Sequence, residues 1–358
     1  MGACASAPSG PLADLSLTRP TKTETRTVRR FQGAHTDLVN DVASSGAFGE
    51  CISCGEDKMI AITDWASGHV VQTWRGHRRG VHCVVGLRPF DGVLSGSRDA
   101  TAHVWRRGNP QPEATLAGHE LTVAAVAAAD NGRVAMTGSR DSSVRVWDLS
   151  TAACTGRAHV SRNVVTCLSW VADEPTLVAQ GSEDLRLRLW DVRALSRPAS
   201  VIEGYTYFPL CVDCAGHLVL TGSNGFDGTG CELRLWDRRT LKQVHEMRGH
   251  KQAVTGCALL RSQAGAGWSS LRAVSGSKDG EVRLWDASTG QAHVQPLWLS
   301  SGGVTGMAAA TPEAAPPNGG EAHALATTTN GEVHVLCERA DGTGLDHVAV
   351  ATAAPSHD

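Results

Sequence analysis

Short runs in which hydrophobic and polar residues alternate recur along the whole chain. In the run from Ser143 to Trp147, two valines alternate with Ser and Arg before a tryptophan ends the run. Alternation with a period of two is the pattern of a strand that buries one face, and turn residues fall between the runs. The pattern therefore predicts an all-β protein built from many short strands.

The alternating runs belong to a sequence repeat. Six segments align, three of them with a complete Ser/Thr-Gly-Ser-x-Asp motif and four with a later Trp-Asp, and a degenerate seventh segment spans residues 327–339. Gly-His precedes several of them, at Gly76-His77, Gly118-His119 and Gly249-His250, with Ala34-His35 as a near match. The aligned anchor positions lie 42 to 51 residues apart and are Thr63, Trp105, Trp147, Trp190, Trp236, Trp285 and Leu336. A period of this size indicates a repeat architecture such as a propeller.

These motifs resemble those of the WD-repeat family over residues 26–350. The resemblance implies a seven-bladed β-propeller of WD40 repeats. A physical argument supports it, because a single four-stranded sheet cannot bury both faces unless further sheets stack beside it around an axis. We expect the propeller at residues 25–351, a flexible N-terminal tail at 1–24 and a C-terminal tail at 352–358. Either residues 25–31 or residues 347–351 supply the outer strand that closes the ring.

The composition narrows the range of functions. The chain of 358 residues has a formal net charge of −3, which argues against binding nucleic acid through a broad positive field. Its 10 Trp outnumber its 5 Phe and 2 Tyr together, as expected if a repeated motif requires Trp. No apolar run approaches the roughly 18 residues of a membrane-spanning helix, and no secretory signal is recognisable. The 11 Cys are therefore expected to be reduced thiols in the cytosol.

Three repeats carry the full set of polar residues that the family uses as a structural tetrad. By the resemblance, Asp accepts a hydrogen bond from His, His accepts one from Ser or Thr, and the hydroxyl bonds the Trp indole. The three sets are His77, Ser95, Asp99 and Trp105; His119, Thr137, Asp141 and Trp147; and His250, Ser275, Asp279 and Trp285. Ser, His and Asp also build nucleophilic triads, but a nucleophile needs one exposed hydroxyl and an oxyanion hole. A set that repeats around a ring indicates a scaffold, so no catalytic residues are predicted.

Four repeats depart from the tetrad pattern. The first has Thr63 at the Trp position, with Trp65 two residues later. The fourth has Gln180 in place of Ser, Ser161 aligned with His, and His159 out of register. The fifth lacks Gly-His and contains an insertion, and the seventh has neither the Trp nor the His. We expect these blades to be less rigid, or to be held by their neighbours.

The first residues match the Met-Gly-x-x-x-Ser/Thr signal for N-myristoylation. Gly2 would carry the myristoyl group, and the nearby Cys4 is placed for palmitoylation. A second signal matters because one myristoyl chain gives only marginal membrane binding. Basic residues between positions 19 and 30 would add attraction to anionic lipid. The alternative is an ordinary N-terminal tail whose second residue happens to be Gly.

Residues 160–191 and 223–237 resemble a ciliary branch of the WD-repeat family. The resemblance implies a role in cilium assembly and ciliary trafficking, and a location in the cilium or flagellum and the cytoplasm. It implies protein partners among the intraflagellar transport and cargo-adaptor components and the regulators of Arf-like small GTPases. An acylated N-terminus fits this role, because such proteins work at membranes.

One face of a propeller carries both the Gly-His loops and the turns that hold the repeat Asp, and we call it the top face. Loops on rigid scaffolds often carry binding residues. The predicted partner-binding residues of this face are Arg78, Arg79, Arg98, Arg140, Arg162, Phe226, Lys251 and Lys278. Phe226 would be an apolar anchor in the insertion of the fifth repeat. The alternative is a solvated charged rim with an elaborated turn.

Other candidate sites carry less weight. The Cys51/Cys54 and Cys211/Cys214 pairs are too far apart in the sequence for the usual zinc spacing, so no metal site is predicted. Residues 225–230 are Gly-rich, but they join two strands instead of opening a helix. No cofactor, nucleic acid or small-molecule substrate is predicted.

The sequence favours a non-enzymatic scaffold for protein interactions, tethered to a membrane by its acylated N-terminus. One alternative is a structural axonemal subunit without a lipid anchor. The other is a substrate-receptor propeller of a ubiquitin ligase. Such receptors often carry a surface Trp-Asp-x-Arg pattern, which occurs here at residues 190–193 and 236–239.

Overall fold

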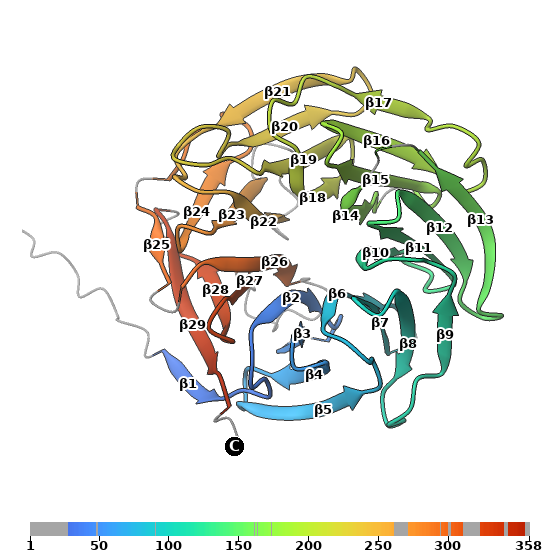
Figure 1. Ribbon diagram of the computed structural model, residues 1–358. Helices are drawn as coiled ribbons and strands as arrows, with labels where there is room; N and C mark the ends of the chain where they lie inside the picture. The colour runs from blue at the N-terminus through green and yellow to red at the C-terminus, as the bar shows by residue number, and fades with distance from the viewer. Residues whose placement is uncertain are drawn as a thin grey trace, which may run out of the picture.

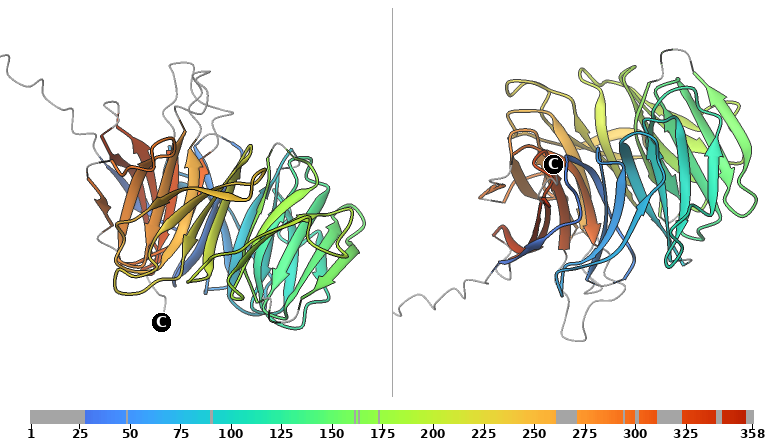
Figure 2. Two further views of the ribbon diagram at one scale, coloured as in Figure 1. Left: turned by 90° about the horizontal axis from the view of Figure 1, so that it is seen from above. Right: turned by 60° about the horizontal axis from the view of Figure 1, so that its bottom comes forward.

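The computed structural model describes residues 28–47, 49–89, 91–160, 162, 164–172, 174–260, 271–293, 295–299, 302–310, 323–339 and 343–354. In these residues every regular element is a β-strand, and the strands form seven sheets arranged in a ring (Figure 1). Figure 2 shows the ring from other sides, with the strands of each sheet running between its two faces. The prediction of an all-β, seven-bladed propeller is confirmed. No helix in this part of the chain has the length and hydropathy that a membrane span requires.

The first six blades are antiparallel sheets of four strands in chain order. Blades one to three consist of β2 (Val39–Ser44), β3 (Glu50–Gly55), β4 (Met59–Asp64) and β5 (His69–Arg75); β6 (Val81–Leu87), β7 (Gly92–Ser97), β8 (Thr101–Arg106) and β9 (Ala114–Ala117); and β10 (Val123–Ala128), β11 (Val134–Ser139), β12 (Ser143–Asp148) and β13 (Ala153–His159). Blades four to six consist of β14 (Val165–Trp170), β15 (Leu177–Ser182), β16 (Arg186–Asp191) and β17 (Ser200–Ile202); β18 (Pro209–Ala215), β19 (Leu218–Ser223), β20 (Leu233–Asp237) and β21 (Lys242–Met247); and β22 (Val254–Leu260), β23 (Arg272–Ser277), β24 (Glu281–Asp286) and β25 (Leu297–Trp298).

The hydrophobic core lies between the blades. One buried cluster combines Ile52 and Ile60 of blade one with Val84 and Trp105 of blade two. In the next cluster, Trp147 of blade three packs among residues of blade two. The repeat tryptophan therefore packs against the preceding blade. Each sheet buries both faces because a neighbour stacks on either side, which removes apolar surface from water.

Both ends of the chain contribute to the last blade. It contains β26 (Val304–Ala310), β27 (His323–Thr328), β28 (Val333–Glu338) and β29 (Leu345–Thr352), with β1 (Arg29–Gln32) as a fifth strand. β29 pairs antiparallel with β28, and β1 adds in parallel to the outer edge of β29 (Figure 1). The two segments expected to compete for one position thus occupy adjacent positions. The C-terminal strand is the fourth strand, and the innermost strands β26 and β2 contact each other to close the ring.

Candidate functional site

Three buried tetrads fix the loops of the top face. In blade two, Nδ1 of His77 lies 3.0 Å from Oδ2 of Asp99, and Nε2 lies 2.8 Å from Oγ of Ser95. The Trp105 indole donates to the same hydroxyl at 2.8 Å. Blades three and six repeat these contacts in the sets His119, Asp141, Thr137 and Trp147, and His250, Asp279, Ser275 and Trp285. The bonds join the loop that enters a blade to its second and third strands.

The tetrad carboxylates also hold the backbone of the loop. Asp99 accepts from the amide of Arg78, the residue that follows His77, at 2.8 Å. Glu120 and Lys251 donate in the same way to their tetrad Asp in blades three and six. A fixed carboxylate therefore positions the backbone from which the exposed Arg78 and Lys251 side chains project.

Hydrogen bonding keeps these carboxylates ionised. Burial alone would raise the pKa of Asp141, but hydrogen bonds from Ser143, the Glu120 amide and His119 outweigh it and lower the pKa to about 2. The pKa values of Asp99 and Asp279 are lowered in the same way, against the effect of burial. An ionised carboxylate accepts stronger hydrogen bonds than a neutral one, so the loops stay fixed at neutral pH.

The tetrad hydroxyls are unsuited to nucleophilic chemistry. Ser95, Thr137 and Ser275 are each fully buried and each accept a hydrogen bond from a tryptophan indole. A substrate could not reach these oxygens without disrupting the core of the blade. The geometry therefore matches the structural interpretation of the sets.

Blades four and five replace the missing histidine with other residues. In blade four, the guanidinium of Arg188 pairs with both oxygens of Asp184, and Gln180 accepts from the Trp190 indole at 2.9 Å. Ser161, which the sequence aligns with His, lies outside the described residues. Arg188 is itself buried, and sequence comparison with the other repeats did not suggest this role.

Blade five uses a tyrosine. The Tyr205 hydroxyl bonds Oγ1 of Thr221 at 3.0 Å, and the Trp236 indole donates to the same Thr221 atom at 3.3 Å. Arg234 stacks over the Tyr205 ring, 5.4 Å from its centroid. Tyr205 follows Gly204, as His follows Gly elsewhere, so a Gly-Tyr pair was the signal that could have identified it.

All eight predicted partner-binding residues are exposed, but they differ in their electrostatic surroundings. Arg98 pairs with Glu56 of blade one at 3.0 Å, and Arg140 lies 3.7 Å from Glu183 of blade four. Within the described chain no ion pair involves the other five basic residues, namely Arg78, Arg79, Arg162, Lys251 and Lys278. Two of the predicted contact residues thus already have acidic partners from neighbouring blades, which the sequence did not reveal.

Two exposed arginines lie at the opposite end of the third strands. Arg193 pairs with Asp191 through two bonds of 3.0 and 2.7 Å, and Arg239 pairs with Asp237 through bonds of 3.1 and 2.7 Å. Their side chains remain 71% and 61% exposed. These are the two Trp-Asp-x-Arg patterns, on neighbouring blades four and five.

A cavity of about 290 Å³ opens between blades two and three at the same end of the strands. Leu87, Val104 and Leu149 form apolar parts of its wall, and Arg106 and Arg133 contribute charge. None of the predicted partner-binding residues lines it. The cavity and the predicted binding residues therefore lie on different faces.

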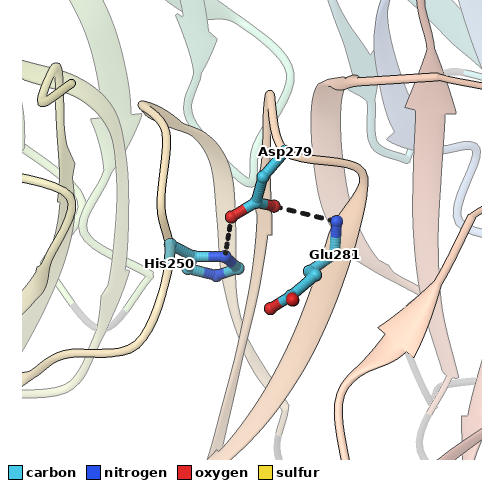
Figure 3. Close-up of side chains that lie close together, drawn as sticks. All are labelled: His250, Asp279 and Glu281. Atoms are coloured by element: carbon cyan, nitrogen blue, oxygen red, sulfur yellow. Dashed lines mark hydrogen bonds and ion pairs between the residues drawn. The ribbon is translucent and has the colours of Figure 1, made fainter. Parts of the chain in front are cut away.

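One group of side chains in blade six has the spacing of a metal site. Ligand atoms of His250, Asp279 and Glu281 lie within 4.8 Å of one another (Figure 3). However, Nδ1 and Nε2 of His250 already bond Asp279 and Ser275. Glu281 accepts a hydrogen bond from Arg283 at 2.8 Å. The group is therefore a structural tetrad next to the Arg283–Glu281 ion pair. Few of its ligand atoms are free to bind a cation.

The two Cys-x-x-Cys pairs lie in different blades. Cys51 and Cys54 belong to β3, Cys211 and Cys214 belong to β18, and all four are free and buried. Burial, with a smaller effect of Glu50, raises the pKa of Cys51 to about 12. Burial therefore keeps this thiol protonated in the metal-free protein. The predicted lipidation residues Gly2 and Cys4 lie outside the described residues.

Four segments match the family model described as WD domain, G-beta repeat, at residues 68–106, 110–148, 152–191 and 241–286. These four segments are WD40 repeats, and they lie in a seven-bladed propeller. Each matched segment ends with the strand that carries the repeat tryptophan, in blades two, three, four and six.

This WD40 propeller is similar to fungal proteins named for nuclear distribution. It is 30% identical to nuclear distribution protein PAC1 of Arthroderma otae over 205 residues, which cover 52% of this chain and 43% of that protein. It is 27% identical to nuclear distribution protein nudF of Aspergillus niger over 278 residues, covering 72% and 61%. The chain thus spans less than two thirds of either relative. Neither name refers to a cilium, so the finer resemblance to a ciliary branch stays a proposal.

A solved structure shows the same fold. The WD40 β-propeller domain of Doa1 superposes with a TM-score of 0.69 and covers 87% of this chain and 96% of that domain. The sequences are 18% identical, so this similarity concerns the fold alone.

Proposed function

We propose that this WD40 propeller is a non-enzymatic scaffold that binds its protein partners on the top face. The supporting observation is the contrast between fixed loops and free side chains. The buried tetrads hold the loop backbones, while Arg78, Arg79 and Lys251 project from them without an ion pair in the described chain. Residues presented from a rigid support lose little entropy on binding, which favours recognition.

Charge reversal tests the top face. Arg78→Glu combined with Arg79→Glu removes two free charges and leaves the Arg98–Glu56 ion pair intact. Arg133→Glu, at the opposite end of the strands, is the matched control. We expect proteins that co-purify with the full chain from its native source to be lost with the double variant and kept with the control, as measured by quantitative mass spectrometry. Equal recovery with all three chains would refute a top-face site.

We further propose that the scaffold acts in cilium assembly and ciliary trafficking, in the cilium and cytoplasm, with its N-terminus acylated on Gly2 and Cys4. The resemblance of blades four and five to WD repeat-containing protein thirty-one supports the cellular role. The myristoylation signal supports the tether. The exposed Arg29 and Arg30 of β1 would add attraction to anionic lipid.

The intact mass of the N-terminal peptide from the native source tests the tether, with Gly2→Ala as the control. A myristoyl mass on Gly2, together with release of the variant from membranes, is the expected result. Cys4→Ser should show intermediate release, because a single acyl chain binds only marginally. An acetylated or unmodified N-terminus would remove the anchor and leave a soluble or axonemal propeller.

Two further functions are suggested, one by the fungal relatives and one by the face opposite the top face. The names of the fungal relatives suggest a role in nuclear distribution. The exposed Arg193 and Arg239, each held by a strand-end Asp, favour a substrate receptor of a ubiquitin ligase. Replacing both arginines with Ala should abolish co-purification with ligase components in the second case. It should leave co-purification unchanged if partners bind only to the top face.

A further inference from the structure

We propose that the turn between β19 and β20 is a preformed anchor that inserts Phe226 into an apolar socket bordered by carboxylates on a partner protein. The turn spans residues 224–232 and lies on the top face of blade five. This inference rests on the proposed scaffold function, because both place a protein on this face. Beyond that function, the inference specifies the residue that enters the partner and the chemistry of the partner's binding site.

Phe226 has the largest exposure among the exposed large hydrophobic residues of the described chain. Its exposed fraction is 71%, compared with 56% for Trp298 and 54% for Leu121. An aromatic ring left in water is unfavourable, and transfer into an apolar pocket releases that cost. Aromatic residues that fill pockets contribute most of the affinity at many interfaces.

The Phe226 side chain projects from a rigid hairpin. The amide of Phe226 donates to the Thr229 carbonyl at 2.9 Å, and the Thr229 amide donates back at 3.0 Å. Between them, Asp227 and Gly228 have φ angles of 50° and 74°. Positive φ at both central residues is the type I′ pattern of tight two-residue hairpins. The backbone that carries Phe226 therefore has a single well-defined conformation.

Close packing below the hairpin limits its movement toward the blade. Gly230 has a φ angle of 71° and lies directly against the Tyr207 ring, where a Cβ atom would come within 2.0 Å of a ring carbon. Only glycine fits at this position.

A chain of hydrogen bonds connects the hairpin to the tetrad of blade six. The Gly228 amide donates to the Lys251 carbonyl at 2.9 Å, and the Lys251 amide donates to Oδ2 of Asp279 at 2.8 Å. Asp279 is held in turn by His250 (Figure 3). The insertion of blade five is thus hydrogen-bonded to the tetrad loop of its neighbour. Such support reduces the entropy that binding must remove.

The charges around the hairpin indicate the partner. Lys251 supports the turn through its backbone and Lys278 precedes Asp279, and both ammonium groups are exposed without an ion pair in the described chain. Of the two acidic residues in the turn, Asp227 at the tip is exposed and Glu232 is buried. The loop at residues 251–253 bonds the hairpin through the Lys251 carbonyl and bonds the Lys278 amide through the Ala253 carbonyl, so both lysines belong to the surface that adjoins the hairpin. A surface with these two cations suits a socket with carboxylates on its rim. Elsewhere on the face, Arg98 and Arg140 already have acidic neighbours.

A photo-crosslinker tests the anchor directly. Benzoylphenylalanine is placed at position 226 of the full chain in its native source, and at Val244 as an exposed control position in the outer strand β21 of the same blade. We expect position 226 to crosslink to one partner, at a peptide with apolar residues and nearby Asp or Glu. The Val244 position should not yield that peptide.

Binding of the crosslinked partner is then measured with variants. Phe226→Ala should weaken it at least about tenfold, and Lys251→Glu with Lys278→Glu should also weaken it. Val244→Ala should bind like the wild type. Because Phe226 is largely solvent-exposed, Phe226→Ala should keep the wild-type Tm, which excludes misfolding as the cause.

The outcomes separate this inference from the proposed function. If the partner binds Phe226→Ala as tightly as the wild type, the anchor is refuted and the scaffold function stands. If the crosslinked peptide lacks acidic residues, the charge argument is wrong. If no protein binds the wild type or any variant, the scaffold proposal fails and the anchor fails with it.

Discussion

His103 shows how a single position adapts within the repeat. It lies in the middle of β8, where the third strands of blades three to six carry arginine. Its ring stacks on His77 with centroids 4.0 Å apart. Burial, with a further contribution from His77, lowers the pKa of His103 from 6.5 to about 4. The residue is therefore neutral in the folded protein at neutral pH.

This shift predicts acid sensitivity. In the unfolded chain His103 binds a proton near pH 6.5, whereas in the folded chain it does so only near pH 4. Because the unfolded state binds more protons in this window, the free energy of unfolding should fall as the pH drops from 6.5 to 4. Above pH 6.5 the contribution of His103 is fully present. His103→Asn should reduce the loss of Tm across this range, and an identical pH dependence in the variant would contradict the assignment.

At the scale of elements, the two terminal strands have unequal roles. β29 buries Ala349, Val350 and Ala351 and covers the edge of β28. In β1 only Phe31 is half-buried, and the other residues are exposed. β1 pairs with the outer edge of β29, which is itself the fourth strand of the blade. Closure of the ring therefore depends on the C-terminal strand, and β1 adds to a sheet that is complete without it.

Two truncations test this difference. Removal of residues 1–32 should leave a folded ring that loses about 1 to 2 kcal/mol from the partial burial of Phe31. Removal of residues 345–358 exposes the edge of β28 and should prevent cooperative folding. Circular dichroism melts of the two truncated chains provide the measurement. Similar stability of both would show that either strand can close the ring.

At the scale of the molecule, hydrogen bonds from the inner strands join successive blades around the ring. Thr305 of blade seven donates to the Val39 carbonyl of blade one at 2.6 Å. Thr255 of blade six makes the equivalent bond to Val304 of blade seven, also at 2.6 Å. The joint where the ends of the chain meet thus has the same chemistry as a joint between consecutive blades. Because each core cluster is shared by two blades, the blades are expected to unfold together.

Matched substitutions test whether the closing joint is weak. Thr305→Val and Thr255→Val each remove the hydrogen bond between blades and a second contact of the same hydroxyl, to Thr327 and to the Gly276 carbonyl respectively. Each should cost about 1 kcal/mol at nearly constant volume. Both variants should keep a single unfolding transition that coincides by tryptophan fluorescence and circular dichroism. A second transition in Thr305→Val alone would show that the ring opens first where the chain ends meet.

The sequence by itself determined the strands, the number of blades and the three complete tetrads. These features depend on the sequence spacing within one repeat, such as the number of residues from His77 to Trp105. Similar spacings recur in several repeats. Local alternation and turn residues are sufficient for such inferences because their cause is local.

Only the tertiary structure decided which residues meet across blades. Tyr205 and Arg188 replace the tetrad histidine through side chains that the repeat pattern does not contain. Arg98 forms an ion pair with Glu56 of another blade, so its charge is already partly neutralised, which the sequence does not show. The Gly228 amide bonds the Lys251 carbonyl of the next blade. Thr305 and Val39 are 266 residues apart in the chain. Contacts of this kind arise from stacking and ring closure, which place distant segments side by side, and no local pattern encodes them.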